Sequence, residues 1–585
     1  METRMNRKVV WGRRLIVIGL VLALFGTLIA FLNQTDFGRI TVKPFKIISD
    51  EGLAINCMIY IPDGVSQENP APCAFAVHGG NSSRYAMANY AQEFARRGYV
   101  VVSLDQPSNG QSDRGVSNFF GTEDVMKFIT TLEFVDQSKL VVMGHSMGNT
   151  VVSMAEANPQ FGVKGAMALG SGASTAPEAK LNVCVQVGIK DENTGPRGSD
   201  TAVLGPAYYP VSSALASFLN VPVGTEITSG FTTGSLEDDS LRQFNQPGCG
   251  HLGMLYSSEG IAMALEFMGK VLGISYTLDV NSQTWIIREF ATAAAFIGLF
   301  VVSFGIISLM LGKRKDAVLE ETAQGHAIPN AAYWIGLVLM CLVPAVGIQE
   351  LYMAGKSFFL ALSPDLFAME HISGVIFWML CTAVMVLVIS LVVKKFTKDY
   401  DWSFDKQILS ISPKQLAYYL GIAVTVTVVQ YLLVCLAGFF FNVCIRLFNS
   451  ELHPFTLTRF GVFWVYLPMY LIYYIIIGYV QTSSLLCKNQ PVWSQYVRTI
   501  LVSVLAPGVM LALWYGSVGI TGVNTFFEWR FVLGVLLNFL PGIAVGAGIQ
   551  VYSYHRTGKI WLGALTNAIL FTWMSTSIGV MISPA

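Results

Sequence analysis

The sequence carries little charge for its length. Only 13% of its 585 residues are Asp, Glu, Lys or Arg, and 37 basic side chains balance 37 acidic ones. This balance excludes proteins that bind polyanions through overall basicity, so we expect no nucleic-acid partner. Hydrophobic residues make up 53% of the chain and the mean hydropathy is +0.53, well outside the balance of a soluble domain.

Cysteine patterns that bind metals are also lacking. The nine cysteines form no C-x-x-C pair and no evident cluster with histidine, so we expect no metal and no cofactor. Three of the first four, Cys57, Cys73 and Cys184, lie in apolar runs and are expected to be small buried hydrophobes rather than disulfide partners. Cys249 stands two residues before His251, so a reactive thiol at Cys249 stays an alternative.

Long apolar runs, by contrast, are frequent. Nine are long enough to span a bilayer. The first, Leu15–Leu32, follows a basic N-terminus and lacks a convincing small-x-small cleavage site, which favours a retained anchor over a cleaved signal peptide. The other eight all follow residue 283: Trp285–Leu311, Ala332–Glu350, Ser373–Val393, Leu416–Gly438, Val462–Thr482, Ile500–Ile520, Phe531–Val551 and Ile560–Ile582.

The basic residues orient these runs. If nine spans alternate, most Lys and Arg outside residues 36–283 fall on the side of the N-terminus, which the positive-inside rule makes cytoplasmic. Residues 36–283 and the C-terminus are then extracytoplasmic. That segment holds 15 Lys and Arg against 24 Asp and Glu, a net charge of −9, and the remainder of the chain carries +9.

A G-x-S-x-G pentapeptide is the strongest chemical signal. Gly144–Gly148 stands between the apolar run Lys139–Met143 and the helix-like run Asn149–Ala155. This strand–turn–helix context is what a nucleophile elbow requires, with glycines on both sides because the turn is tight. Ser146 is therefore the candidate nucleophile.

A second motif precedes the pentapeptide. The predicted strand Ala71–Val77 ends in His78-Gly79-Gly80-Asn81, a turn of the kind that offers a backbone N–H to an oxyanion. Gly79 and Gly80 are the candidates on this turn, and the backbone N–H of Met147 is the other candidate donor.

Two further residues would complete a triad. The predicted strand Asn182–Asp191 ends in G-x-x-D, which nominates Asp191 as the acid, with the adjacent Glu192 as runner-up. His251 lies on a Gly-rich turn before a predicted helix, Glu259–Leu272. A serine hydroxyl needs a base within hydrogen-bond reach, and the acid would hold the histidine in the required tautomer.

The order Ser146, Asp191, His251 resembles that of the α/β-hydrolase superfamily. Residues 37–273, with leading strands at Arg39–Val42 and Leu53–Pro62, look like the dienelactone-hydrolase and serine-aminopeptidase branches. The resemblance implies a mostly parallel sheet flanked by helices, joined here to an all-α polytopic transmembrane domain. The expected domains are an N-terminal anchor (1–36), the hydrolase (37–283) with a substrate-shaping lid at 193–239, and about eight transmembrane helices (284–585).

These signals predict a membrane-embedded, outward-facing serine hydrolase. It would cleave an ester, thioester or amide of a small-molecule or lipid-like acyl substrate and contact membrane lipids. The alternative is a transport or signalling protein whose hydrolase-like domain binds a ligand without turnover. Acyl transfer and peptidase activity also stay open.

Overall fold

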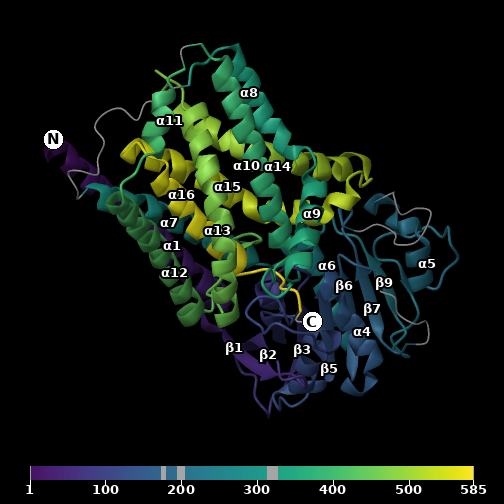
Figure 1. Ribbon diagram of the computed structural model, residues 1–585. Coiled ribbons are helices and arrows are strands. Elements are labelled where there is room, and N and C mark those ends of the chain that lie inside the picture. Colours follow the sequence, from purple (N-terminus) through teal and green to yellow (C-terminus); the bar gives the residue numbers. More distant parts are fainter. Residues whose placement is uncertain (1, 173–178, 194–204, 313–326, 399, 584–585) are drawn as a thin grey trace. The chain divides into compact units, whose positions relative to one another are not determined.

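The computed structural model describes residues 2–172, 179–193, 205–312, 327–398 and 400–583 (Figure 1). The chain forms two compact units, each built from separated pieces of sequence. Unit 1 comprises Met1–Leu28, Ala291–Leu511 and Phe531–Ser577, and unit 2 comprises Ile29–Phe290, Ala512–Arg530 and Ile578–Ala585.

Unit 2 contains a nine-stranded sheet with the order β1-β2-β4-β3-β5-β6-β7-β9-β8. Strands β4, β3, β5, β6, β7 and β9 run parallel, whereas β2 is antiparallel to both β1 and β4, and β8 is antiparallel to β9. This arrangement confirms the predicted fold class of this unit. The strands are β1 Ile40–Ile48, β2 Ala54–Pro62, β3 Ala71–Val77, β4 Val100–Leu104, β5 Val135–His145, β6 Val163–Leu169, β7 Asn182–Gln186, β8 Thr232–Thr233 and β9 Arg242–Asn245.

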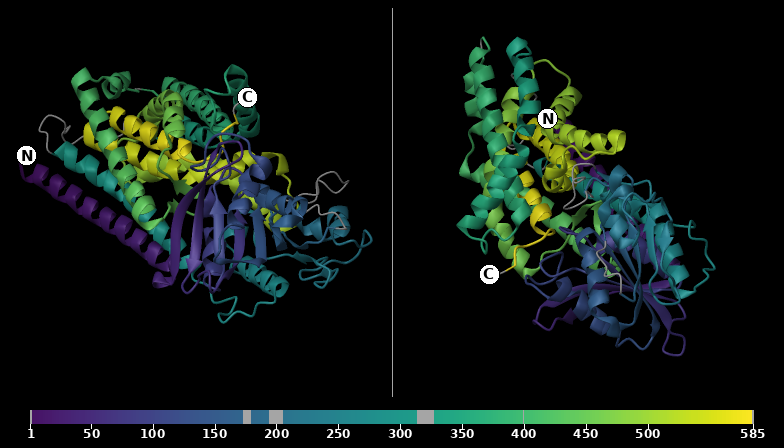
Figure 2. Two further views of the ribbon diagram at one scale, coloured as in Figure 1. Left: turned by 90° about the horizontal axis from the view of Figure 1, so that it is seen from below. Right: turned by 90° about the vertical axis from the view of Figure 1, so that its right-hand side faces the viewer.

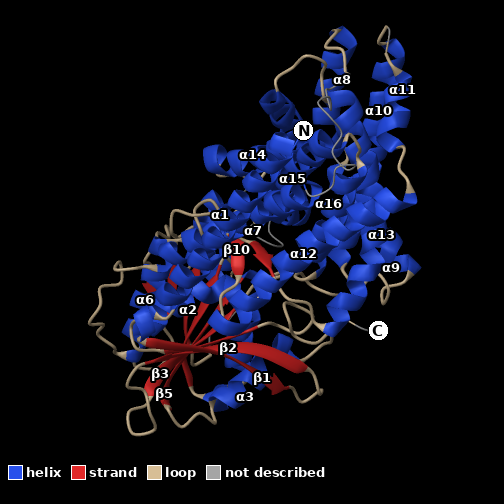
Figure 3. Cartoon of the chain, turned by 90° about the vertical axis from the view of Figure 1, so that its left-hand side faces the viewer, coloured by secondary structure: helices blue, strands red, loops and turns tan. Residues whose placement is uncertain are grey.

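Helices cover both faces of this sheet, which explains its continuous apolar strands. In β3, Phe75 and Val77 face a core shared with α3 (Thr122–Ile129), α4 (Thr150–Ala157) and α5 (Ser213–Phe218). Ala74 and Ala76 face the opposite core, shared with α2 (Ala88–Ala95) and α6 (Ser258–Leu272). Figure 3 shows α2 and α6 on one side of the strands and α3 on the other.

Helix α2 also forms hydrogen bonds with the chain segments that precede and follow the sheet. Gln92 Nε2 donates to Asn33 Oδ1 at 3.0 Å and to Thr284 Oγ1 at 3.1 Å. Arg288 Nη1 donates to the carbonyl oxygen of Ala88 at 3.0 Å. One short helix therefore fixes both ends of the hydrolase segment.

In its described residues, unit 1 is helical apart from an isolated bridge between Ala327 and Cys487 and one short hairpin, β10 Ile445–Leu447 and β11 Ser450–Leu452. Several of the helices below extend at one end into unit 2. They are α1 Glu2–Gln34, α7 Trp285–Gly312, α8 Ala331–Leu342, α9 Ile348–Leu362, α10 Glu370–Phe396, α11 Trp402–Leu409, α12 Pro413–Phe441, α13 Leu457–Val480, α14 Val492–Thr521, α15 Arg530–Thr557 and α16 Trp561–Thr576.

Within the described residues, seven of these helices are long and apolar enough to cross a membrane, or up to eight if a bent pair counts as one span. This indicates a multi-pass membrane protein, and it corrects the predicted nine runs in two places. The predicted run Ala332–Glu350 is interrupted at Pro344 and at Gly347, which has a φ of 70° and directly precedes α9. The helices before and after this break are bent by 53° relative to each other. The last run forms only α16, whose 16 residues extend about 24 Å, short of a bilayer core.

Helices α1 and α7 pack closely through glycines spaced seven residues apart. A Cβ on Gly19 would lie 2.7 Å from the carbonyl oxygen of Gly298, and one on Gly12 would lie 3.0 Å from that of Gly305. In Figure 2 the purple helix α1 runs alongside the teal helix α7. Small residues at such a contact let the two helix backbones approach closely.

Candidate active site

The pentapeptide forms a strained turn at the end of the central strand. Strand β5 ends at His145, and Ser146 adopts a φ of 53°, in the left-handed region that a residue with a side chain rarely occupies. A Cβ on Gly144 would lie 2.0 Å from the carbonyl oxygen of Gly148, and one on Gly148 would lie 2.5 Å from that of Val77. A side chain at either flanking glycine would therefore clash with neighbouring backbone, as is typical of a nucleophile elbow.

Asp191 and His251 are brought together across 60 positions of sequence. Both carboxylate oxygens of Asp191 lie 3.1 Å from His251 Nδ1, and both residues are buried. An ionised carboxylate only accepts hydrogen bonds, so Nδ1 carries the proton and Nε2 is the basic nitrogen. This is the tautomer that a serine nucleophile needs.

His251 lies against the elbow through the residue that precedes the nucleophile. The ring centroids of His145 and His251 are 4.8 Å apart, and His145 Nε2 is 3.0 Å from the carbonyl oxygen of His251. Within the described residues Ser146 Oγ has no hydrogen-bond partner. In enzymes without substrate the contact between nucleophile and base is often longer than a hydrogen bond, so this geometry is compatible with a triad.

The surroundings of His251 favour its protonated form. Burial alone lowers the pKa of His251, but the negative charge of Asp191, its hydrogen bond and the charge of Glu192 outweigh burial, so the pKa is raised. His145 behaves in the opposite way, because burial and the neighbouring His251 lower its pKa to about 3. Only one of the two adjacent histidines is therefore suited to accept a proton near neutral pH.

Glu192, the runner-up acid, contacts the backbone of His251 and not its ring. Its Oε2 accepts a hydrogen bond from the backbone N–H of His251 at 2.8 Å. Burial, followed by the charge of Asp191, raises the pKa of Glu192. The Glu192 side chain thus contacts the backbone of the histidine turn, while Asp191 contacts the ring of His251.

The predicted oxyanion turn lies directly beside the nucleophile. A Cβ on Gly79 would lie 3.1 Å from Ser146 Cβ, and one on Gly80 would lie 3.7 Å from Met147 Sδ. His78 is buried and supports the turn: its Nε2 accepts from the backbone N–H of Gln106 at 3.0 Å, so Nδ1 carries the proton and donates to Gly79 O at 2.6 Å. The predicted donors of Gly79, Gly80 and Met147 all belong to these two adjoining turns.

Two contributions from the C-terminal third of the chain were not predicted. The Nδ2 of buried Asn524 donates to the carbonyl oxygen of Glu192, 332 positions earlier in the chain. The backbone N–H of Val580 donates to Asn81 Oδ1 at 3.0 Å, next to the oxyanion turn, and that of Met581 donates to Ser108 O at 2.8 Å. All of these residues belong to unit 2. No local pattern in the sequence signals contacts over such separations.

Cys249 does not behave as a reactive thiol. Burial is the largest effect on its pKa, which is raised to about 12, so the thiolate is disfavoured at neutral pH. All nine cysteines lie in the described parts of the chain, where each is free.

The predicted lid falls partly outside the described residues. Positions 194–204 are not described, and the part that follows contains the short helix α5 and strand β8. β8 pairs with β9, so the end of the segment belongs to the edge of the sheet. A substrate-shaping role for residues 193–239 stays a prediction.

Comparisons with known proteins agree with this fold. A family model described as alpha/beta hydrolase fold matches residues 76–192. An uncharacterized Escherichia coli protein, YcjY, is 27% identical over 104 residues, which cover 16% of this chain and 34% of that protein. The chain thus spans about a third of the length of this curated relative.

Two solved structures are each similar to part of this chain. A predicted CIB-like hydrolase from Thermoplasma acidophilum is 15% identical, with 40% of this chain and 99% of that chain covered and a TM-score of 0.28. A membrane phospholipase A described as a bacterial virulence factor is 14% identical, with 44% and 92% covered and a TM-score of 0.28.

Proposed function

Because unit 2 has the α/β-hydrolase fold, we propose that the protein is a serine hydrolase with Ser146, His251 and Asp191 as its triad. The observation that carries the proposal is the left-handed φ of 53° at Ser146, held between two glycines that tolerate no side chain. A strained backbone conformation persists only where the surrounding structure enforces it, and such strain concentrates at active sites. Here the strained residue, Ser146, stands at a strand end near the paired Asp191 and His251.

The residues have distinct roles in the proposed reaction. Ser146 Oγ attacks the acyl carbon while His251 Nε2 takes its proton. The tetrahedral oxyanion is stabilised by backbone N–H groups of Met147 and of the Gly79–Gly80 turn, each worth about 3 kcal/mol. His251 then protonates the leaving group as the acyl-enzyme forms. Water, activated by the same histidine, releases the acid and restores the serine.

We propose further that the substrate is lipid-like and that the site faces outward. Two observations support this. Residues 522–524 directly follow the apolar helix α14, and Asn524 contacts the Glu192 turn. Residues 578–583 follow α16 and contact the side of the predicted oxyanion turn. The surplus of acidic residues in 36–283 and of basic residues elsewhere supports an extracytoplasmic catalytic domain.

Fluorophosphonate labelling of membranes tests the chemistry. We expect labelling of the wild type that is lost in Ser146→Ala and in His251→Ala and retained in Ser138→Ala, a matched change of an exposed serine. A folded wild type that does not label would favour the alternative, a domain that binds a ligand without turnover.

Substrate length tests the lipid-like part separately. With a series of acyl esters, kcat/KM should rise with chain length for as long as each added CH2 is buried, at about 0.8 kcal/mol each. A preference for acetyl esters would reject a lipid-like substrate while leaving the triad intact.

Orientation is tested on intact cells. A membrane-impermeant amine reagent should modify exposed Lys43 of β1 and spare exposed Lys406 of α11 until the cells are opened. The reverse pattern would place the catalytic domain inside.

A further inference from the structure

The hairpin β10–β11, which connects α12 and α13, has a polar face that is buried. Arg446 is paired with Glu451 and Ile445 with Leu452, and continuing this register places Cys444 opposite His453. Residues paired across two strands point to the same face, so Cys444, Arg446, Glu451 and His453 share one face. The other face carries Ile445 and Leu452, which belong to the hydrophobic core of unit 1.

The four polar residues are almost fully enclosed. The exposed fractions are 8% for Cys444, 2% for Arg446, 5% for Glu451 and 2% for His453. Burying ionisable groups is costly unless they are paired or bind a metal. The charge on this face therefore needs a compensating arrangement.

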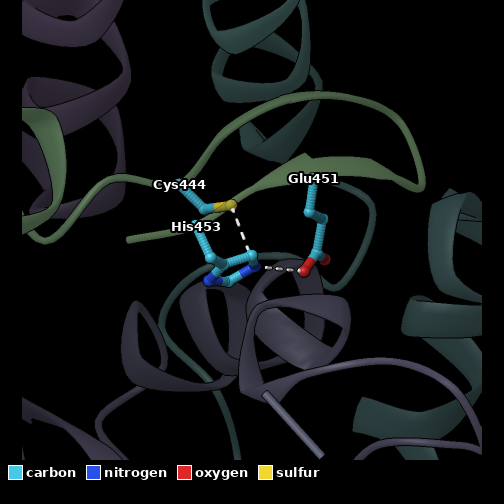
Figure 4. A group of neighbouring side chains, drawn as sticks. All are labelled: Cys444, Glu451 and His453. Atoms are coloured by element: carbon cyan, nitrogen blue, oxygen red, sulfur yellow. Dashed lines mark hydrogen bonds and ion pairs between the residues drawn. The ribbon is translucent and has the colours of Figure 1, made fainter. Parts of the chain in front are cut away.

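Three metal-binding atoms of this face converge on one point (Figure 4). His453 Nε2 lies 3.7 Å from Cys444 Sγ and 2.9 Å from Glu451 Oε2, and all three atoms lie within 4.8 Å of one another. A tetrahedral zinc with normal bond lengths would hold a sulfur and a nitrogen ligand about 3.5 Å apart. The spacing of Cys444 Sγ and His453 Nε2 is thus close to that of a zinc site, and the spacing of His453 Nε2 and Glu451 Oε2 is that of a hydrogen bond.

The cluster does not have the geometry of a second catalytic relay. A Cys–His–Glu relay uses both ring nitrogens, one toward the nucleophile and one toward the acid. Here the thiol and the carboxylate both face Nε2. Side chains that surround a single nitrogen are arranged as ligands around a shared ion.

We propose that Cys444, Glu451 and His453 bind one zinc ion, with the fourth position filled by a small ligand such as water. A thiolate, an imidazole and a carboxylate together suit zinc better than magnesium or calcium, which prefer oxygen ligands alone. The sequence-based expectation of no cluster of cysteine and histidine is therefore wrong, because these side chains meet only when the hairpin forms.

Arg446 supports this site from the outer shell. Its Nη1 lies 3.4 Å from Glu451 Oε1, which leaves Oε2 directed at His453. A side chain that hydrogen-bonds and orients a metal-ligating carboxylate usually raises the metal affinity by about ten- to a hundredfold. The zinc would fix the hairpin, and with it the ends of α12 and α13.

Metal analysis of the full-length protein, purified in detergent without chelators, tests the proposal. We expect about one zinc per chain in the wild type, less than about a tenth of that in Cys444→Ser and His453→Gln, and an unchanged content in Cys435→Ser, a cysteine of α12 outside the cluster. Zinc that persists in Cys444→Ser would overturn the assignment.

Cobalt replacement provides a measurement that does not depend on the variants folding. Wild-type protein stripped of metal and given Co²⁺ should show a thiolate-to-cobalt charge-transfer band and tetrahedral d–d bands of high intensity, and zinc should abolish both. A wild type that holds no zinc and gives no such bands when Co²⁺ is added would contradict the site.

Discussion

The two units each contain a buried histidine beside a carboxylate, yet the two arrangements differ in one respect. In unit 2, Asp191 faces Nδ1 of His251 and leaves Nε2 for the nucleophile. In unit 1, Glu451 and Cys444 both face Nε2 of His453. A histidine with different partners on its two ring nitrogens can transfer a proton between them, whereas a histidine with two partners on the same nitrogen is arranged to bind a metal ion. The residue types alone do not distinguish these outcomes.

The largest expected effect is the difference in ester turnover between substitutions of His251 and of His453. His251→Gln removes the base, so turnover of an acyl ester should fall by about 10⁴-fold or more. His453→Gln should leave turnover within a few-fold while the zinc content is lost. Parallel assays of ester hydrolysis and metal content check both, and a large loss of turnover in His453→Gln with retained folding would remove the distinction.

The two neighbouring acids provide the next comparison. Asp191→Asn should lower kcat by about 10⁴-fold, because the amide no longer holds the required tautomer of His251. Glu192→Gln retains an oxygen that accepts from the backbone N–H of His251, so kcat should fall by less than about tenfold. A larger loss of kcat in Glu192→Gln than in Asp191→Asn would assign the acid to Glu192.

The pH dependence should follow the raised pKa of His251. The base acts when neutral, so kcat/KM rises with pH through this pKa, and the acidic limb should lie above the ordinary value of about 6.5. Any residual activity of Asp191→Asn should show the limb at lower pH, because the charge that raises the pKa is gone. A limb in Asp191→Asn at or above that of the wild type would contradict this cause.

The smallest effect concerns the contact from the C-terminal third. Asn524→Ala leaves the buried carbonyl of Glu192 without this donor, at a cost of about 1–3 kcal/mol in the free energy of unfolding. We expect a lower melting temperature and fluorophosphonate labelling slower by less than about tenfold. Asn69→Ala, a change of an exposed asparagine, should alter neither.

The proposed catalytic residues could be named from the sequence because each lies within a local motif near the end of a strand. Ser146, Asp191 and His251 were named from short patterns and their order. Strands β6 and β9 were not predicted, because Lys164 and Gly165 interrupt the apolar run of β6 and β9 has only four residues and begins with polar ones. Local patterns predict elements well only where an apolar run or a turn motif is strong.

Contacts over long separations were not predictable. Asn524 and Val580 reach the site only through the folded path of the chain, and the spacing of Cys444, Glu451 and His453 matches no common metal motif. The number of spans was overestimated because hydropathy registers an apolar run without the break at Pro344 and Gly347. Helix geometry, rather than composition, decides such cases.

Mapping the modified residue tests the central claim most directly. Detergent-solubilised wild-type protein would be treated with a fluorophosphonate, digested and analysed by tandem mass spectrometry. We expect a single phosphonyl adduct on Ser146 that is absent when the protein is denatured before treatment. An adduct on another serine, or none on a folded protein, would contradict Ser146 as the activated nucleophile.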